Sequence, residues 1–385
     1  MNKNFIKVTL LMASMLTMLA NAIISPSLPF ITDAFSDVPH AEFLTKLMMT
    51  LPSLSVAVMS PFAGTIVDKI GRVKVLIIAL IFYIIAGSSG FWLNNLYLIL
   101  VGRIFLGFGI AGILTATVTL IGDYFVDDER QRFLSIQGTF MALGGLIFIT
   151  IAGYITGIDW RLPFLLYAIG FVALVLTIKY LPEPKKEEML LQQQEKGKSS
   201  RTIWFIFLSG FLGTLFFYII PVQLPYYLKS LDGVSSGQIG LSIGLLTLTQ
   251  AFSAYFYKNL KEKLGYYIIY ALSFAVMGIG YFGIGVSENY LQIVICVMFL
   301  GVGVGWLFPN ANLWLINSIS AAKRGKYVGL LNSFTFLGMF MSPILIQPIQ
   351  QQFEIKGSFT VVGFALLMIS ICYFFISKIS ISKKE

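Results

Sequence analysis

The residue best suited to chemistry is Arg103, a single guanidinium in the otherwise apolar stretch 97–122. That stretch is long enough to cross a bilayer as a helix, and Arg103 lies about seven residues into it, or roughly 10 Å along the axis. A lone charge at that depth costs on the order of 3 kcal/mol or more, so it persists where it serves a purpose. We expect Arg103 to act in substrate binding or ion coupling. Hydrogen bonding to backbone carbonyls and snorkelling outward are the alternatives.

A second group of charges is interleaved with glycines. Gly64, Asp68, Gly71 and Arg72 follow one another closely, and Asp123 lies at the end of the stretch that contains Arg103. A carboxylate such as Asp68 can also face the free N–H groups at the start of a helix near residue 325. We expect these residues to form a functional cluster. The alternative is that these charges only mark the cytoplasmic side.

Other chemistries are excluded by what the sequence lacks. It has a single histidine, His40, and two cysteines, Cys296 and Cys372, both inside apolar runs. This set offers no metal site, no disulfide and no nucleophile–histidine pair. No phosphate-binding loop is present, so direct ATP drive is not expected. We expect neither an enzyme nor a cofactor.

Composition places the chain in a membrane. Of its 385 residues 57% are hydrophobic and only 12% are charged, against about 25% charged in a soluble domain. The mean hydropathy is +0.83. The net charge of +9 is better explained by orientation in a membrane than by nucleic-acid binding.

The apolar residues predict an all-α protein with twelve transmembrane helices. The expected spans are roughly 8–31, 43–67, 73–93, 97–122, 132–156, 162–181, 202–228, 236–257, 265–286, 290–316, 325–349 and 357–377. The polar segment 182–201 is the natural linker between an N-terminal six-helix bundle, 1–181, and a C-terminal one, 202–385. Most Lys and Arg residues fall on one side of this arrangement, which predicts that both termini and the linker are cytoplasmic.

The two halves repeat each other at an offset of 194 positions. Asp68-Lys69-Ile70-Gly71 matches Glu262-Lys263-Leu264-Gly265, and the Phe-Leu-Gly-x-Gly run at 105–109 matches that at 299–303. Proteins built from two such repeats generally bind a solute between the halves and alternate access around it. The repeat therefore favours a transporter. The proline pairs at 26 and 29 and at 221 and 225 either bend a moving gate or merely shape the outer helix ends.

The segment 64–74 resembles the signature loop of the major facilitator superfamily, G-x-x-x-D-[RK]-x-G-R-[RK], between spans 2 and 3. Arg103 with the glycines at 107, 109 and 112 supports the resemblance, as do Trp160, Arg161 and Phe164. It implies a fold of two pseudo-symmetric six-helix bundles and a secondary transporter, with protons as the expected coupling ion. It also implies that Asp68, Arg72 and the acid at 123 latch the halves together on the cytoplasmic side.

Two features depart from the drug–proton antiporters of that superfamily. None of the eighteen acidic residues is placed in mid-membrane, and Asn21 stands at the depth where a buried acid is common. Span 5 lacks the Gly-Pro pair. A cavity with an arginine and no carboxylate attracts anions or zwitterions more readily than cations. We therefore expect export of an opine-like or metallophore-like metabolite, with multidrug efflux, nutrient uptake and a non-transporting sensor as alternatives.

Polar residues in the spans are candidates for lining the solute path. Ser14, Thr17, Asn21 and Ser25 fall within about an 80° arc of the first span, with helix packing as the alternative. The further candidates are Gln137, Tyr218, Gln223, Gln250, Asn310, Asn312, Asn332 and Trp306. We expect a monomer in a bacterial cell membrane whose partners are lipid, a small-molecule substrate and protons, but no nucleic acid.

Overall fold

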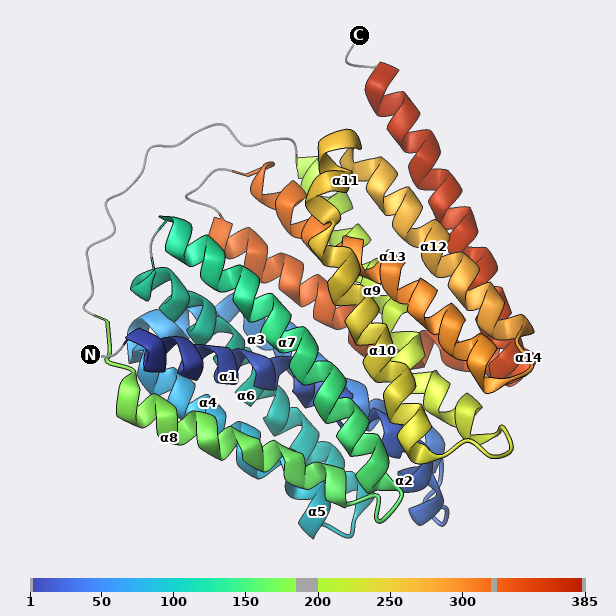
Figure 1. Ribbon diagram of the computed structural model, residues 1–385, viewed down its shortest axis with the longest axis horizontal. Helices are drawn as coiled ribbons and strands as arrows, with labels where there is room; N and C mark the ends of the chain where they lie inside the picture. The colour runs from blue at the N-terminus through green and yellow to red at the C-terminus, as the bar shows by residue number, and fades with distance from the viewer. Residues whose placement is uncertain (1–2, 126, 185–199, 320–323, 383–385) are drawn as a thin grey trace. The chain divides into compact units, whose positions relative to one another are not determined.

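The computed structural model describes residues 3–125, 127–184, 200–319 and 324–382, and these form helices and connections without a β-strand (Figure 1). The chain divides into two compact units. The first comprises Met1–Gln193 with Ser235–Gly240, and the second comprises Gln194–Val234 with Leu241–Glu385. The division between Gln193 and Gln194 falls within the segment expected to be the linker, and the short run Ser235–Gly240 returns to the first unit.

The first unit contains ten helical elements. They are α1 (Lys3–Ala22), η1 (Ser25–Ser27), α2 (Leu28–Ala34), α3 (Ala41–Ile70), α4 (Arg72–Gly87), α5 (Ser89–Trp92), α6 (Leu96–Tyr124), α7 (Asp127–Thr156), η2 (Leu162–Ile169) and α8 (Gly170–Tyr180). Helix α6 is central because it packs against both α3 and α4, while α1 packs against α7.

The second unit contains the other six described helices, apart from the start of α10, which belongs to the first unit up to Gly240. They are α9 (Ser200–Lys229), α10 (Ser236–Tyr255), α11 (Tyr257–Lys263), α12 (Tyr266–Val286), α13 (Tyr290–Ile316) and α14 (Arg324–Ser382). Helix α14 is interrupted at Glu354, whose φ of 58° and ψ of −179° are not helical. The expected spans 325–349 and 357–377 lie on either side of this break.

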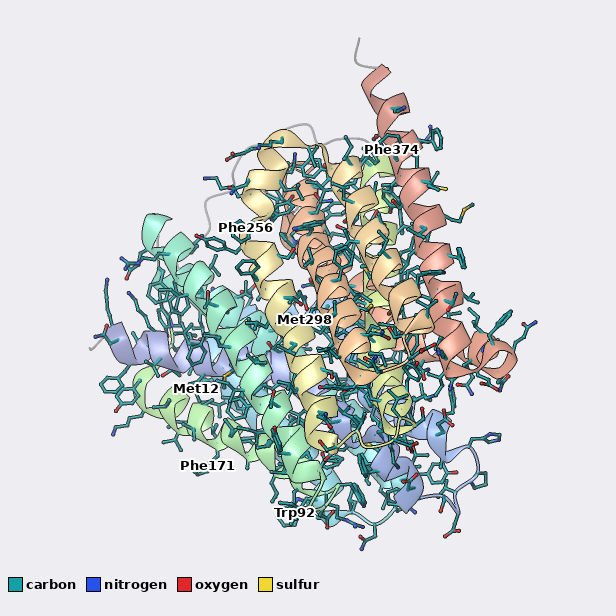
Figure 2. All side chains as sticks on the ribbon, turned by 45° about the vertical axis from the view of Figure 1, so that its right-hand side comes forward. Met12, Trp92, Phe171, Phe256, Met298 and Phe374 are labelled. Carbon is teal, nitrogen blue, oxygen red and sulfur yellow. The ribbon has the colours of Figure 1, made fainter. Side chains whose placement is uncertain are left out.

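Ten helices of the described residues are long and apolar enough to cross a membrane, or eleven if the bent pair α10 and α11 is one span. The last of them covers Lys326–Lys378 and includes the break at Glu354. The predicted count of twelve therefore stays a prediction. Large apolar side chains such as Trp92, Phe171 and Phe374 project from the outer faces of the helices, as contact with lipid requires (Figure 2).

Proline and asparagine set several helix ends. Helix α1 stops at Ala22, and Pro26 is the second residue of η1, where proline fits because its φ is fixed and no N–H partner is needed. The side chain of Asn95 accepts hydrogen bonds from the backbone N–H groups of Tyr97 and Leu98, which caps α6. Asn289, offset by 194 positions, caps α13 in the same way.

The repeat of the sequence is present in the helix contacts. In each unit two glycines of the fourth long helix press against backbone carbonyls of two neighbouring helices, and an added Cβ would come closer than 3.0 Å to the carbonyl oxygen. The contacts are Gly107 with Pro52 and Gly109 with Ala79 in the first unit, and Gly301 with Leu246 and Gly303 with Ser273 in the second. All four partners repeat at 194 positions. Small residues permit this close approach of helices in lipid.

Candidate functional site

Arg103 lies inside the first unit with none of its surface exposed. Its Nη1 donates a hydrogen bond to the Tyr167 hydroxyl at 2.9 Å, and its Nη2 donates to the carbonyl oxygen of Gly87 at 3.5 Å. The guanidinium carbon is 4.7 Å from the ring centre of Phe164 and 5.1 Å from that of Tyr167. Among the described residues no carboxylate forms an ion pair with it.

Two helix ends supply the negative potential that this cation needs. Gly87 is the last residue of α4, and the Tyr167 hydroxyl donates in turn to the carbonyl oxygen of Ala20, near the end of α1. The last carbonyls of a helix lack helical N–H partners and carry partial negative charge. The described contacts of Arg103 are thus hydrogen bonds to one hydroxyl and one backbone carbonyl, and contacts with two aromatic rings. Its role in binding or coupling stays a prediction.

The charged residues of the signature loop form a cluster at one end of the first unit. Arg72 Nε lies 2.8 Å from Asp123 Oδ2, and Arg72 Nη2 lies 3.9 Å from Asp68 Oδ1. The Arg72 and Asp123 side chains are 17% and 27% exposed, so the closer pair is partly shielded from water. The pair joins the first residue of α4 to the last turn of α6. Whether the cluster also latches the two halves stays a prediction.

The two glycines of the loop differ in purpose. Gly71 has a φ of +112°, which side-chain-bearing residues rarely adopt. A Cβ there would also lie 3.0 Å from Cδ of Glu183. Gly64 lies inside α3, and a Cβ there would meet nothing within 4 Å. The backbone of the loop therefore depends on glycine at 71 and not at 64.

Glu183 belongs to this cluster, although the sequence placed it only in the linker. Its carboxylate accepts hydrogen bonds from the backbone N–H groups of Arg72, Val73 and Lys74 at 2.5, 3.0 and 3.4 Å. An anion at a helix start satisfies free N–H groups and the helix dipole. Helix α4 has no acid in its own first turn. The lack of an acid at this helix start, beside a cluster of basic residues, is the signal that could have predicted a carboxylate from another segment.

Lys46 is a second buried charge that the sequence did not single out. Its side chain is fully buried in α3, and its Nζ lies 2.5 Å from Glu42 Oε1 one turn earlier. A buried ammonium needs such a partner because removal from water penalises the charge. The spacing of four residues between a glutamate and a lysine was the available signal.

The predicted polar residues of the first unit are brought together only in part. Gln137 of α7 donates through Nε2 to the Ser14 hydroxyl of α1 at 2.6 Å, so these two residues meet. Ser25 is fully buried in η1. Asn21 lies in α1, but its side chain is outside the described residues. The contact between Gln137 and Ser14 joins two helices that already pack together.

Three of the predicted residues of the second unit either form local hydrogen bonds or lie exposed at the surface. Asn310 donates to the carbonyl oxygen of Tyr266 and accepts from the Tyr257 hydroxyl, each at 3.1 Å. Asn312 donates to a carbonyl of its own helix. Asn332 is exposed. Their polarity alone therefore gives no support to a place in a solute path.

Gln223 is different, because its amide is buried without a hydrogen-bond partner in the described structure. It lies in α9 between Pro221 and Pro225 and is 1% exposed, yet neither Oε1 nor Nε2 forms a hydrogen bond. The Oε1 atom of Gln250 is also buried and unpaired. An unsatisfied buried amide costs about 1–3 kcal/mol for each group left unpaired. Tyr218 is buried on the same helix, and Trp306 is half-buried on α13.

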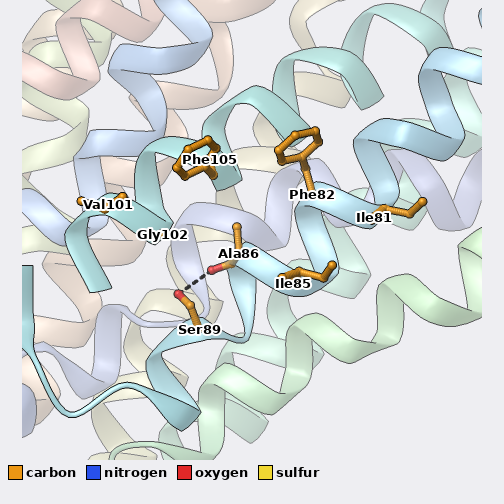
Figure 3. Close-up of a pocket in the computed structure, with 8 residues that line it drawn as sticks. All are labelled: Ile81, Phe82, Ile85, Ala86, Ser89, Val101, Gly102 and Phe105. Carbon is orange, nitrogen blue, oxygen red and sulfur yellow. Dashed lines mark hydrogen bonds between the residues drawn. The ribbon is translucent and has the colours of Figure 1, made fainter. Parts of the chain in front are cut away.

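A groove of about 410 Å³ lies between the outer faces of α4 and α6 (Figure 3). It is lined by apolar side chains and by Ser89, whose hydroxyl donates to the carbonyl oxygen of Ala86 at 2.7 Å. None of the predicted site residues lines it. Ile85 and Phe105 in its wall are exposed, which is the surface that a membrane span presents to lipid chains.

Comparison with known proteins identifies the family. A family model of the Major Facilitator Superfamily matches residues 10–232 and 206–385. Together with the helical fold and the signature loop, this shows that the chain belongs to the Major Facilitator Superfamily. It is a multi-pass membrane transporter and not an enzyme.

Two bacterial relatives, one named for quinolone resistance and one for bacillibactin export, match most of the chain. The quinolone resistance protein NorA of Staphylococcus aureus (strain COL) is 21% identical over 306 residues, 78% of this chain and 79% of NorA. The bacillibactin exporter of Bacillus subtilis (strain 168) is 22% identical over 347 residues, 84% of this chain and 85% of the relative.

Among solved structures, a D-xylose–proton symporter superposes with a TM-score of 0.79 at 16% identity, covering 97% of both chains. At that identity the likeness shows the fold alone. The fold is thus shared with transporters that differ widely in sequence.

Proposed function

We propose that this protein is a secondary active transporter that exports a small polar metabolite by alternating access. Membership of the Major Facilitator Superfamily and a relative named as a bacillibactin exporter support export, and the relative named for quinolone resistance is consistent with it. The bacillibactin exporter supports a metabolite as cargo. The repeated halves support alternating access, since repeat-built transporters move their halves around a shared site.

The observation that carries the substrate class is the unpaired amide of Gln223. A carboxamide offers both donors and an acceptor, so a solute that supplies both would satisfy it. In this proposal the solute is opine-like or metallophore-like, anionic or zwitterionic. The placement of Asp33, Asp68 and Asp123 near helix ends supports this, because no carboxylate among them is placed to balance a cation in mid-membrane.

Coupling to protons is part of the proposal and rests on the family. Proton-coupled exchange would let the membrane gradient drive export without ATP. A substrate or coupling role for Arg103 needs a conformation in which its Nε, unpaired and buried in the described structure, gains a partner.

Multidrug efflux is the second candidate function, favoured by the likeness to the quinolone resistance protein NorA. Such a pump would accept chemically unrelated lipophilic compounds. It would depend on apolar walls such as Trp306 more than on the amide of Gln223.

The test compares metabolites in medium and cytosol of cells with and without the gene, followed by flux measurements in proteoliposomes with and without a pH gradient. Gln223→Leu is expected to lower flux of the identified metabolite at least tenfold, about the effect of 1.4 kcal/mol. Gln352→Leu, which alters an exposed amide of α14, serves as the control. Unchanged flux in Gln223→Leu, or export of many unrelated drugs and no metabolite, would contradict the metabolite proposal.

A further inference from the structure

The repeat places two different pairs of side chains at equivalent positions. Arg72 and Asp123 in the first unit correspond, at the offset of 194, to Tyr266 and Asn317 in the second. Arg72 Nε lies 2.8 Å from Asp123 Oδ2. Asn317 Nδ2 donates to the Tyr266 hydroxyl, also at 2.8 Å. Each pair joins the first residue of the unit's third long helix to the end of the fourth. We call each of these two pairs a tie.

The tie of the second unit is uncharged and held by aromatic packing. The Tyr266 ring stacks on Trp314 with a centroid separation of 5.2 Å and an angle of 1°. Its backbone carbonyl accepts from Asn310. Lys261 Nζ lies 4.1 Å from the Tyr266 ring centre, but it donates its hydrogen bond to the carbonyl of Leu264 and not to the tie. The hydrogen bond between Asn317 and Tyr266 thus involves no net charge.

The tie of the first unit is ionic and is part of a larger set of charges. Asp68 approaches Arg72 from α3, and the Glu183 carboxylate accepts from the first three N–H groups of α4. Arg130 donates to the carbonyl of Gly122, one residue before Asp123. Interactions between partly exposed charges weaken as salt screens them, whereas a neutral hydrogen bond is little affected.

We propose that the protein carries one ionic and one neutral cytoplasmic tie, so that ionic strength loosens the end of the first unit and leaves the second unit fixed. The two halves would therefore respond differently to salt, although their helix contacts repeat. It rests on the paired geometry within each unit and does not depend on the identity of the substrate.

Amide hydrogen exchange tests this directly in detergent or nanodiscs. The segments 68–76 and 262–270 are equivalent, and the first contains the three amides bound by Glu183. Raising NaCl from low millimolar to 1 M is expected to speed exchange in 68–76 about two- to fivefold, the effect of a partly exposed ion pair. Exchange in 262–270 is expected to stay the same. An equal response of both segments, or of neither, would overturn the proposal even without a variant.

Reciprocal swaps sharpen the test. Arg72→Tyr with Asp123→Asn should remove the salt response of 68–76, and Tyr266→Arg with Asn317→Asp should create one in 262–270. Glu183→Gln should raise exchange at 72–74 alone. A salt response that persists in 68–76 after the first swap would assign it to other charges and overturn the proposal. If the wild-type protein shows the expected exchange patterns but transports no solute, the result would count against the transport proposal and not against this one.

Discussion

At the scale of single residues, the buried guanidinium of Arg103 is stabilised without a carboxylate. Its partners are the Tyr167 hydroxyl, the Gly87 carbonyl and two ring faces. Tyr167 accepts from Arg103 and donates to Ala20, so one hydroxyl satisfies a cation and a helix end together. Hydrogen bonds to charged groups contribute more than neutral ones, about 1.5–3 kcal/mol. Tyr167 should therefore matter more than its buried aromatic neighbours.

Two buried tyrosines beside Arg103 provide a matched comparison. Tyr167→Phe should lower the free energy of unfolding by about 1.5–3 kcal/mol, since it leaves a buried charge without its acceptor. Tyr83, whose ring centre is 5.4 Å from that of Tyr167, has a buried hydroxyl without a hydrogen-bond partner in the described structure. Tyr83→Phe should be neutral or slightly stabilising. Thermal unfolding in detergent measures both, and equal effects would refute this account of Arg103.

The loop glycines give a second residue-scale prediction. Gly71→Ala should destabilise the first unit by about 1–3 kcal/mol, because alanine at φ +112° is strained and its Cβ crowds Glu183. Gly64→Ala should be neutral or stabilising, because alanine favours a helix and meets no neighbour there. Thermal unfolding of the two variants decides the point. Similar losses would show that the motif needs both glycines for a reason other than backbone geometry.

At the scale of elements, charges also join the beginnings of α1 and α7. Lys7 Nζ lies 2.8 Å from Glu129 Oε1, and Lys3 Nζ lies 3.7 Å from Glu129 Oε2. The hydrogen bond from Lys7, together with the positive charge of both lysines, lowers the pKa of Glu129 below its ordinary value. A carboxyl whose pKa is lowered by folding stabilises the fold above its unfolded pKa, and that contribution is lost as pH falls through the folded pKa.

The pH prediction follows from that sign. Stability of the wild type should fall relative to Glu129→Gln as pH drops from about 5 to 3, and the two should differ by a constant amount between pH 6 and 8. Thermal unfolding across this range provides the measurement. Glu288→Gln, in an exposed connection, controls for removal of one carboxylate. A difference that does not change with pH would mean that Glu129 does not titrate as a partner of Lys7.

Element-scale features were the most predictable from sequence. The apolar runs predicted the helical spans, and the glycines at 107, 109, 301 and 303 were found through the repeat at an offset of 194. The caps at Asn95 and Asn289 were not predicted, although asparagine before an apolar run is a typical helix start. Partnerships across the fold were not predictable in the same way. Arg103 could be singled out because charge is rare in apolar runs. Its acceptors could not be predicted, because one is a tyrosine 64 positions away and the other is a backbone carbonyl, which every residue has. Asn310 was predicted as a site residue from its polarity alone, but in the structure it forms hydrogen bonds with a tyrosine hydroxyl and a backbone carbonyl.

At the scale of the whole molecule, the distribution of Lys and Arg predicts that the linker is cytoplasmic. The test starts from a variant in which Cys296 and Cys372 are serine. A cysteine at Ser230, in the connection after α9, should react with an impermeant maleimide in intact cells. One at Ser199, in the linker, should react only after permeabilisation. The reverse labelling would show the opposite orientation in the membrane and would place both ties on the outer side.

The glycine contacts have a consequence for the origin of the molecule. The two glycine–carbonyl pairs of the first unit recur in the second at one offset, which is what duplication of an ancestral half-length gene would leave behind. Both descendants kept glycine where a methyl group would force helices apart. The side chains at 72 and 123 and at 266 and 317 diverged, one pair to opposite charges and the other to phenol and amide. The close helix contacts are therefore the same in both halves, while the chemistry at one end of each half differs.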